Sequence, residues 1–321
     1  MGDLPENRVS QSRPFQNVGI DYCGPFFLKE KKFRNKNKIK AYVTVFVCFS
    51  TKAIHLELTT DLTAETCLAA LKRFLSRRGR PHNIYTDNGT NFIGVKNEIQ
   101  QIEQILKSDE YQQKLQHYLS TEGIQWHLSP PRSPHFGGLW EAGVKSLKNH
   151  LTKTIGETLV TYEQFYTFLT EVEAILNSQP LTQLSSDPKD FTALTPSHFL
   201  IGDTLTNLPE LDFMHTATNR LSQWQHLQRL KQHFWSRWQK EYLQELHTRK
   251  KWHLGDTKDI KEGKLVLMRE DNTPPLHWTL GRIIALHPGE DNIPRVVTVR
   301  TAHGTYKRSI KKLSPLPIDD D

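Results

Sequence analysis

The nine residues from Ala41 to Phe49 (AYVTVFVCF) constrain the fold more than any other segment of the chain. They contain no charged side chain and are rich in β-branched and aromatic residues, which is typical of a strand buried on both faces. Such a strand lies inside a sheet that is covered on two sides. The segment therefore favours a layered α/β fold over a sheet with one face open to water.

The segments around this strand alternate between strand-like and helix-like patterns. Apolar residues at steps of three and four between 63 and 78 predict a helix, which Thr63 can cap and Gly79 can end. The order of the elements predicts a mixed sheet with helices packed on it. Further strands are expected at about 15–28, 53–59, 82–86 and 124–128, and further helices at about 139–153 and 162–177.

The last third of the chain has a different pattern. Residues 221–247 form an amphipathic helix, which either docks on the core or pairs with another subunit. From Glu262 onward the apolar period changes to two, and several short strands predict a small β-barrel. The predicted organisation is an N-terminal tail 1–13, an α/β core 14–205, a linker with the helix 206–258, a basic barrel 259–316 and an acidic tail 317–321.

The formal net charge of +7 is unevenly distributed. Residues 221–321 hold 18 Lys and Arg against 12 Asp and Glu, a net charge of +6. Residues 1–220 therefore carry a net charge of only +1. Such an excess indicates a polyanionic partner such as nucleic acid, although a mildly basic solvated surface is the alternative. Six Lys and Arg also fall within 31–40, where a solvated turn and a DNA contact remain equally open readings.

Cysteine content and hydropathy exclude two classes of protein. The three cysteines form no CxxC pair, and their odd number argues against a disulfide framework and for buried thiols in a reducing compartment. No segment approaches the roughly 18 apolar residues that a membrane helix needs, and no secretion signal is recognisable. We therefore expect a soluble protein without a membrane partner.

Three acidic residues stand in unusual settings: Asp21 in GIDYCGPF, Asp87 in TDNGTNF and Glu141 in HFGGLWEAGVKSLK. Each alone would be an ordinary turn or capping acid. Together, two carboxylates from the ends of neighbouring strands and one from a helix can meet at one edge of a sheet. Oxygen ligands of this kind suit Mg²⁺ or Mn²⁺, and two such ions can bind the attacking and leaving oxygens of a phosphodiester.

The helix that carries Glu141 is predicted to begin near Leu139, after a Pro- and Gly-rich loop at 129–138, so that Glu141 falls in its first turn. Lys145 and Lys148 follow Glu141 at i+4 and i+7, on one exposed face. These lysines either hold DNA phosphates or form a salt pair with Glu141. Two further groups are expected to support the acidic site from nearby: Asn91 and His135.

The combination of GIDYCGPF, TDNGTNF and PHFGGLWEAGVKSLK, in this order, resembles the retroviral and retrotransposon integrases, and most closely the BEL/Pao class. ILNSQPLT and the last hundred residues extend the resemblance over nearly the whole chain. It implies a ribonuclease H-like core followed by a small SH3-like barrel. It also implies two metal ions, Mg²⁺ or Mn²⁺, one held by Asp21 and Asp87 and the other by Asp21 and Glu141.

The resemblance implies two reactions at one site: water trims the 3′ end of the element's DNA, and the new 3′ hydroxyl then attacks target DNA. It implies DNA partners, a homo-oligomer such as a dimer or tetramer, and a nuclear location with a cytoplasmic phase. The barrel would contact phosphates without reading sequence, and a solvated hairpin face is the alternative. Its densest basic cluster is Lys307, Arg308, Lys311 and Lys312.

Two departures from the integrase pattern leave other functions open. Asp87 and Glu141 are separated by 53 residues, more than in retroviral integrases, and the usual His/His/Cys/Cys zinc module is not recognisable. A fragment or a domesticated copy is therefore expected. The alternatives are a non-catalytic DNA-binding protein derived from an integrase, against which the intact acidic residues argue, and a related nuclease that cleaves RNA in hybrids, against which the barrel argues.

Overall fold

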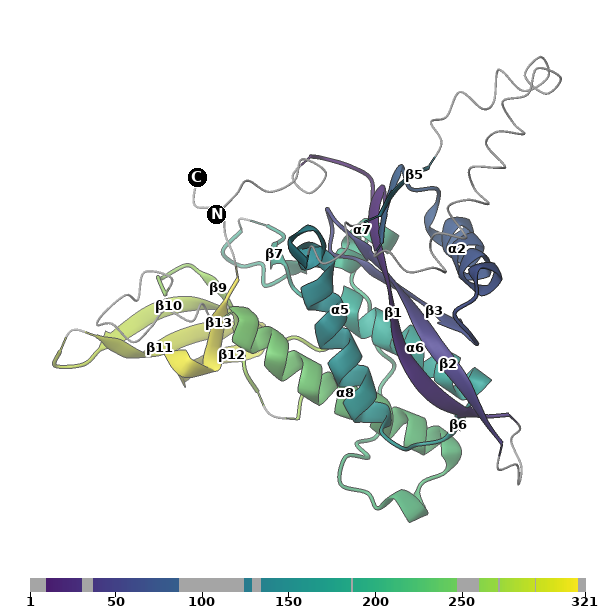
Figure 1. Cartoon of the computed structure of the whole chain (residues 1–321). Coiled ribbons are helices and arrows are strands. Elements are labelled where there is room, and N and C mark those ends of the chain that lie inside the picture. Colours follow the sequence, from purple (N-terminus) through teal and green to yellow (C-terminus); the bar gives the residue numbers. More distant parts are fainter. Residues whose placement is uncertain are drawn as a thin grey trace. The chain divides into compact units, whose positions relative to one another are not determined.

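The computed structural model describes residues 10–30, 37–86, 124–128, 134–185, 187–246, 260–270, 272–291 and 293–316; at 128 and 134–143 it describes the backbone alone. The chain divides into two compact units, Met1–Leu176 and Asn177–Asp321. Figure 1 labels the helices and strands of both.

The first unit contains a mixed sheet of order β3-β2-β1-β4-β5, with β6 pairing separately with β1. The first three strands are antiparallel, whereas β4 runs parallel to β1 and β5 parallel to β4. This confirms the mixed α/β class predicted from the sequence. The strands are β1 (Asn17–Lys29), β2 (Lys38–Cys48), β3 (Ile54–Thr59), β4 (Asn83–Thr86), β5 (Gln125–Leu128) and β6 (Val160–Thr161).

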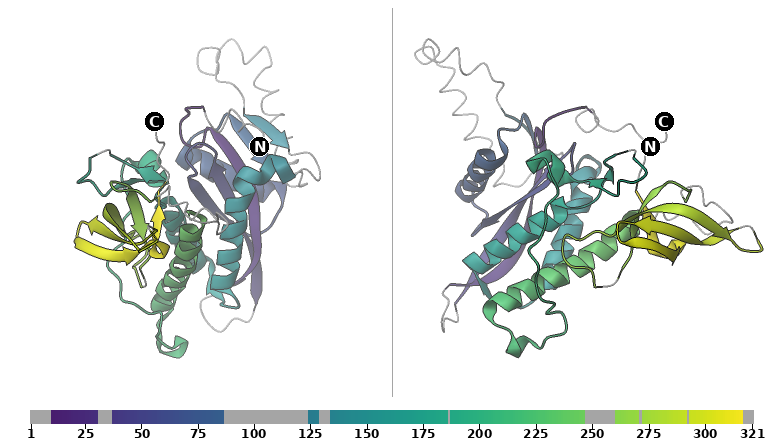
Figure 2. Two further views of the ribbon diagram at one scale, coloured as in Figure 1. Left: turned by 90° about the vertical axis from the view of Figure 1, so that its left-hand side faces the viewer. Right: turned by 180° about the vertical axis from the view of Figure 1, so that it is seen from behind.

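The described helices of the first unit are α2 (Ala64–Arg78), α5 (Pro134–Ile155) and α6 (Tyr162–Asn177). As predicted, the Thr63 side chain caps α2, and Gly79 ends it with a positive φ of 82°. Successive strand residues point to opposite faces, and Tyr22 interacts with Cys67 of α2 while Asp21 pairs with Lys148 of α5. The two helices therefore cover opposite faces of the sheet (Figure 2). Among the described residues, no helix combines the length and apolarity needed to cross a membrane.

The apolar run on β2 is buried, as its composition predicted. Ala41, Val43 and Val45 are fully buried. The Phe46 ring stacks on Phe74 of α2, with centroids 4.3 Å apart, and the Phe74 ring also meets Phe15 edge-on at 5.4 Å. Aromatic packing of this kind anchors α2 to the centre of the sheet. All three cysteines are buried and unpaired, in agreement with the prediction.

The start of α5 differs from the prediction, which was wrong by five residues. The helix begins at Pro134 and not at Leu139. Gly137 and Gly138 lie inside the helix and not in a loop, and Glu141 is its eighth residue and not part of its first turn. Glycine costs about 1 kcal/mol in a helix interior, which favoured the loop prediction. Packing of the apolar stripe further along α5 outweighs that cost, and proline is well suited to a first helical position.

The second unit contains a five-stranded antiparallel sheet of order β12-β11-β10-β9-β13. Strand β9 is buried on both faces: Val266 and Met268 pack in one apolar core, and Leu265 and Leu267 pack in a second core that includes Leu243 of α8. The sheet agrees with the predicted short strands, whereas an SH3-like barrel stays a prediction. The strands are β9 (Leu265–Met268), β10 (Leu280–Pro288), β11 (Pro294–Thr301), β12 (Gly304–Ser309) and β13 (Leu313–Pro315).

The boundary between the units differs from the predicted one. Residues 177–205 were expected in the core, but the structure groups them with the second unit. There Trp278 donates to the hydroxyl of Ser178 at 3.2 Å, and the hydroxyl of Tyr242 donates to the carbonyl of Pro180. The segment has no apolar period that could have shown this. The remaining elements of the unit are β7 (Thr182–Gln183), β8 (Ala193–Leu194), α7 (Pro196–Ile201), the 3₁₀ turns η1 (Thr218–Arg220) and η2 (Ile310–Lys312), and α8 (Gln223–Leu246).

Candidate functional site

Asp21 lies within β1 and forms an ion pair with a lysine of α5. Its Oδ2 accepts a hydrogen bond from Nζ of Lys148 at 2.8 Å, and its Oδ1 accepts one from the backbone N–H of Tyr22 at 2.6 Å. The side chains of Asp21 and Lys148 are 24% and 37% exposed. The carboxylate is thus accessible at the face of the sheet that α5 covers, with a cation already at one oxygen.

The register of the sheet relates Asp21 to the second predicted acid. In the parallel pair of β1 and β4, Ile20 lies opposite Thr86. Asp21 follows Ile20 in the chain, and Asp87 follows Thr86. Asp87 and Asn91 themselves lie outside the described residues, so the structure gives the register up to the last residue before Asp87.

Helix α5 carries the third acid along one face of the sheet. Val144, Leu147, Leu151 and Ile155 are buried along one stripe of the helix, and α5 packs on β1. Glu141 and His135 belong to the backbone of α5, while their side chains are not described. Glu141 precedes Lys148 by seven residues, which is about 10 Å along a helix axis.

Within the described ranges, no three His, Cys, Asp or Glu side chains gather as metal ligands. That finding does not include the side chains of Asp87 and Glu141. The two lysines of α5 differ in their surroundings: Lys145 is exposed, whereas Lys148 is half-buried against Asp21. The ion pair was not predicted from the sequence because its partners are 127 positions apart and no local pattern links them.

The basic cluster of the second unit lies on β12 and η2. Lys307, Lys311 and Lys312 are exposed. Arg308 is half-buried: its guanidinium lies 5.1 Å from the ring centre of Tyr306 and 3.5 Å from a carboxylate oxygen of Glu270. Arg308 is therefore engaged by its own unit, and the DNA-contact role of all four residues stays a prediction.

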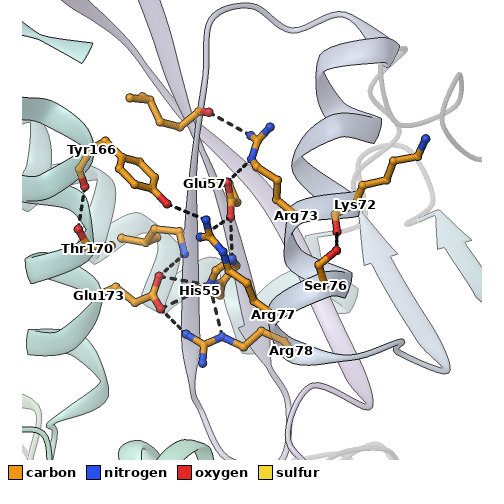
Figure 3. A network of polar contacts seen from close by, with 12 residues as sticks. His55, Glu57, Lys72, Arg73, Ser76, Arg77, Arg78, Tyr166, Thr170 and Glu173 are labelled. Atoms are coloured by element: carbon orange, nitrogen blue, oxygen red, sulfur yellow. Dashed lines mark hydrogen bonds and ion pairs between the residues drawn. The ribbon is translucent and has the colours of Figure 1, made fainter. Parts of the chain in front are cut away.

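A buried polar network joins β3, α2 and α6 of the first unit and was not predicted from the sequence (Figure 3). Nε2 of His55 lies 3.0 Å from Glu57, and its Nδ1 lies 3.3 Å from Glu173. Arg73 and Arg77 donate to Glu57 at 2.6 and 3.0 Å. The side chains of His55 and Glu57 are 1% exposed, so three elements share one desolvated cluster of charges.

Glu173 connects the network to the backbone of the sheet. Its Oε2 accepts a hydrogen bond from the N–H of Leu56 at 2.8 Å, and its Oε1 accepts one from Arg78 at 2.5 Å. One signal in the sequence pointed to this cluster. His55 and Glu57 alternate with apolar residues in IHLELT, so both project to the same face of a strand whose residues are otherwise apolar or small.

The network shifts the pKa values of its members in opposite directions. Burial acts to lower the pKa of His55, but hydrogen bonds to Glu173 and Glu57 outweigh it and raise that pKa above its ordinary value. Burial acts to raise the pKa values of Glu57 and Glu173, but His55 and the arginines lower both. The folded protein therefore favours two carboxylates and a protonated imidazole.

Comparisons with known proteins agree with the core predicted from the sequence. Residues 12–134 match the family model described as "Integrase core domain", and residues 222–316 match one described as "Family of unknown function (DUF5641)". No curated protein matches the chain.

Two solved structures illustrate the structural comparison. A chain of the simian T-cell lymphotropic virus intasome in complex with PP2A regulatory subunit B56 gamma is 13% identical, with a TM-score of 0.38 over 99% of this chain and 85% of that one. The HTLV-2 integrase catalytic core domain in complex with magnesium (trimeric form) is 20% identical, with a TM-score of 0.33 over 59% of this chain and 97% of that one. Because both TM-scores are low, only the family match carries weight. Over residues 12–134 the chain is similar to integrase core domains, as the order of its acidic motifs predicted.

Proposed function

We propose that the chain is a retroelement integrase of the BEL/Pao class that trims the 3′ ends of element DNA and joins them to target DNA. One observation carries the proposal. The parallel register of β1 and β4 pairs Ile20 with Thr86, the residues directly before Asp21 and Asp87, inside a match to integrase core domains. Helix α5, which contains Glu141, packs on the same strand as Asp21. This arrangement of β1, β4 and α5 supports the proposal that Asp21, Asp87 and Glu141 meet at one sheet.

The described residues fit a divalent cation at Asp21. Its Oδ2 attracts the ammonium group of Lys148 at 2.8 Å, so a positive charge is favourable at this oxygen. Asp21, Asp87 and Glu141 would hold two Mg²⁺ or Mn²⁺ ions, with Asn91 and His135 supporting them. When bound, such ions stabilise the charge that develops on the phosphodiester oxygens. The chain's own residues orient the carboxylates: β1 fixes Asp21 through the N–H of Tyr22, and the buried stripe of α5 fixes the helix.

The remaining parts of the proposal concern partners and location. Lys145 and Lys148 on α5, with the basic cluster on β12 and η2, would neutralise DNA phosphates. DNA ends, target DNA and further copies of this chain would be the partners. A nuclear location with a cytoplasmic phase follows from the proposed reaction and from nothing else in the chain.

A joining assay tests the proposal. The chain is incubated with a duplex that carries the terminal sequence of the element, a plasmid target, and Mg²⁺ or Mn²⁺. Joined products that require the metal are expected. Binding to the duplex without joining would favour the non-catalytic derivative, and cleavage of an RNA–DNA hybrid in place of joining would favour the related nuclease.

Replacing Lys148 with Gln is expected to tighten Mn²⁺ binding to the first unit about fivefold. The ammonium competes with the metal for Asp21, and a partly exposed ion pair contributes about 1 kcal/mol. Mn²⁺ affinity is measured by electron paramagnetic resonance of the free ion, without DNA. Lys145→Gln serves as the control because Lys145 is exposed on the same helix, and an equal gain in both variants would contradict the competition.

Reversing the charge of Lys307 and Lys311 together to Glu is expected to weaken DNA binding at least tenfold and to flatten its salt dependence. The slope of log K against log salt concentration is negative, and each phosphate that the protein no longer neutralises makes it less negative by about 0.9. The slope is measured by fluorescence anisotropy on a random duplex, over salt concentrations on either side of roughly 0.15 M, the physiological ionic strength. An unchanged slope would exclude β12 and η2 from the DNA surface.

A further inference from the structure

The second unit contains a cavity of about 730 Å³ that plays no part in the proposed joining reaction. Its wall comes from α8, from residues 204–214, from Glu270 and residues 272–280, and from segments on both sides of β7. The volume falls within the roughly 300–1,000 Å³ that sites for small ligands occupy. Phe191, Trp235 and Trp278 supply an aromatic part of the wall.

The wall is held in place by buried polar contacts. Nζ of Lys231, whose side chain is 1% exposed, donates to Glu210 at 2.5 Å and to Asn207 at 3.2 Å. The side chain of Gln232 accepts from the N–H of Phe213 and donates to the carbonyl of Leu211. These four bonds fix residues 207–213 against α8. The cavity is therefore preformed, which lowers the entropic cost of binding a ligand.

Another part of the wall contains a strained turn. Residues 274–277 form a turn in which the N–H of His277 donates to the carbonyl of Pro274 at 3.1 Å. Within it, Leu276 has a φ of +64°, a conformation that costs a branched side chain free energy and that glycine or asparagine usually adopts. Strain of this kind concentrates at ligand-binding walls. The turn places Leu276 in the lining of the cavity.

The charges around the cavity oppose those of the unit as a whole. Residues 177–321 hold 20 Lys and Arg against 17 Asp and Glu, a net charge of +3, yet three carboxylates line the cavity (Glu210, Asp212 and Glu270) against one lysine, Lys240. Lys231 neutralises Glu210 at 2.5 Å, and Arg308 pairs with Glu270 at 3.5 Å. Asp212 accepts a hydrogen bond from the N–H of Met214. This donor is neutral, so it does not compensate the negative charge of Asp212. A basic side chain in the cavity would be attracted to Asp212.

We infer that this cavity binds a short extended peptide of a partner protein, with a basic side chain placed among apolar ones. The aromatic and proline-rich lining takes the apolar side chains, as in other peptide grooves. Asp212 attracts the basic one. The inference is independent of the joining reaction, because no residue of the acidic site belongs to this unit.

The probes are three pools of blocked pentapeptides with Arg, Gln or Glu at the centre and flanks varied among Leu, Ile, Val, Phe and Pro. Binding to the full chain is followed by saturation-transfer NMR. The Arg pool is expected to bind, the Gln pool about fivefold more weakly and the Glu pool not at all, because a partly exposed charge pair contributes up to about 1 kcal/mol. No binding by any pool, or equal binding by all three, would overturn the inference.

Two variants locate the binding. Ser236→Phe fills the cavity from α8 and is expected to abolish binding of every pool. Because this variant can perturb folding, Asp212→Asn with Glu270→Gln provides a second test that leaves the volume unchanged. The double variant should bind the Arg and Gln pools equally. Glu290→Gln, on the exposed turn between β10 and β11, is the matched control and should behave as the unmodified chain. Arg-pool binding that survives both variants would place the site elsewhere.

Discussion

Strand transfer by the Glu141→Gln variant is expected to fall by about 10³-fold or more, while DNA binding stays within about twofold of the unmodified chain. Glutamine keeps the size of the side chain but removes the negative charge that would bind a divalent ion. Metal ions contribute several kcal/mol to the stabilisation of a phosphoryl transition state, and each 1.4 kcal/mol corresponds to a factor of about ten in rate. DNA affinity depends on basic side chains that the substitution leaves in place.

The matched control for this substitution is Glu157→Gln. Glu157 is an exposed carboxylate two residues beyond the end of α5, so the same chemical change there should leave joining intact. Joined products are quantified on a labelled duplex, and duplex affinity is measured in parallel by anisotropy in the presence of Ca²⁺. Persistent joining by Glu141→Gln would remove Glu141 from the site. Loss of duplex binding would instead show that Glu141 has a structural role.

The elements of the fold that the sequence predicted well are those with a strong local period. The run Ala41–Phe49 required a covered sheet, and β2 is buried as expected. Helix α2 was predicted to within one residue because its cap at Thr63 and its stop at Gly79 are local signals. The start of helix α5 was predicted five residues too late. The low helix propensity of Gly137 and Gly138 indicated a loop, but packing of the apolar stripe beyond them stabilises the helix. Local sequence patterns do not predict helix boundaries that tertiary contacts determine.

The acidic site stays a prediction as a set of residues, and the contacts of Asp21 were not predictable from the sequence. Motif order predicts Asp21, Asp87 and Glu141 as one set, and the described register of β1 and β4 reaches Thr86, the residue before Asp87. The ion pair of Asp21 with Lys148 was not predictable, since it depends on how α5 crosses β1. The cavity of the second unit was missed for the same reason, because its walls come from segments without any apolar period.

The buried network of His55, Glu57 and Glu173 is expected to stabilise the first unit. Glu173→Ala is expected to lower the free energy of unfolding of the first unit by about 3 kcal/mol, because removing one member of a buried ion pair leaves its partners desolvated and uncompensated. The loss should be visible locally: the amide of Leu56, which donates to Glu173, should exchange with solvent about 100-fold faster. Hydrogen exchange resolves β3 and α6 separately from the second unit. Glu163→Ala, exposed on the same helix, should change the free energy by less than about 1 kcal/mol.

The pH dependence of this loss follows from the directions of the pKa shifts. The pKa of Glu173 is lowered from 4.5, so its contribution to stability is present above about pH 4.5 and is lost as the pH falls through the lowered value. The pKa of His55 is raised from 6.5, so its contribution is present below about pH 6.5 and is lost as the pH rises through the raised value. The difference between the unmodified chain and Glu173→Ala should therefore be largest between about pH 4.5 and 6.5 and should decrease on both sides. The difference is measured on the Leu56 amide, after correction for intrinsic exchange. If it is constant across and beyond this pH range, the network stabilises the unit by packing and not by charge.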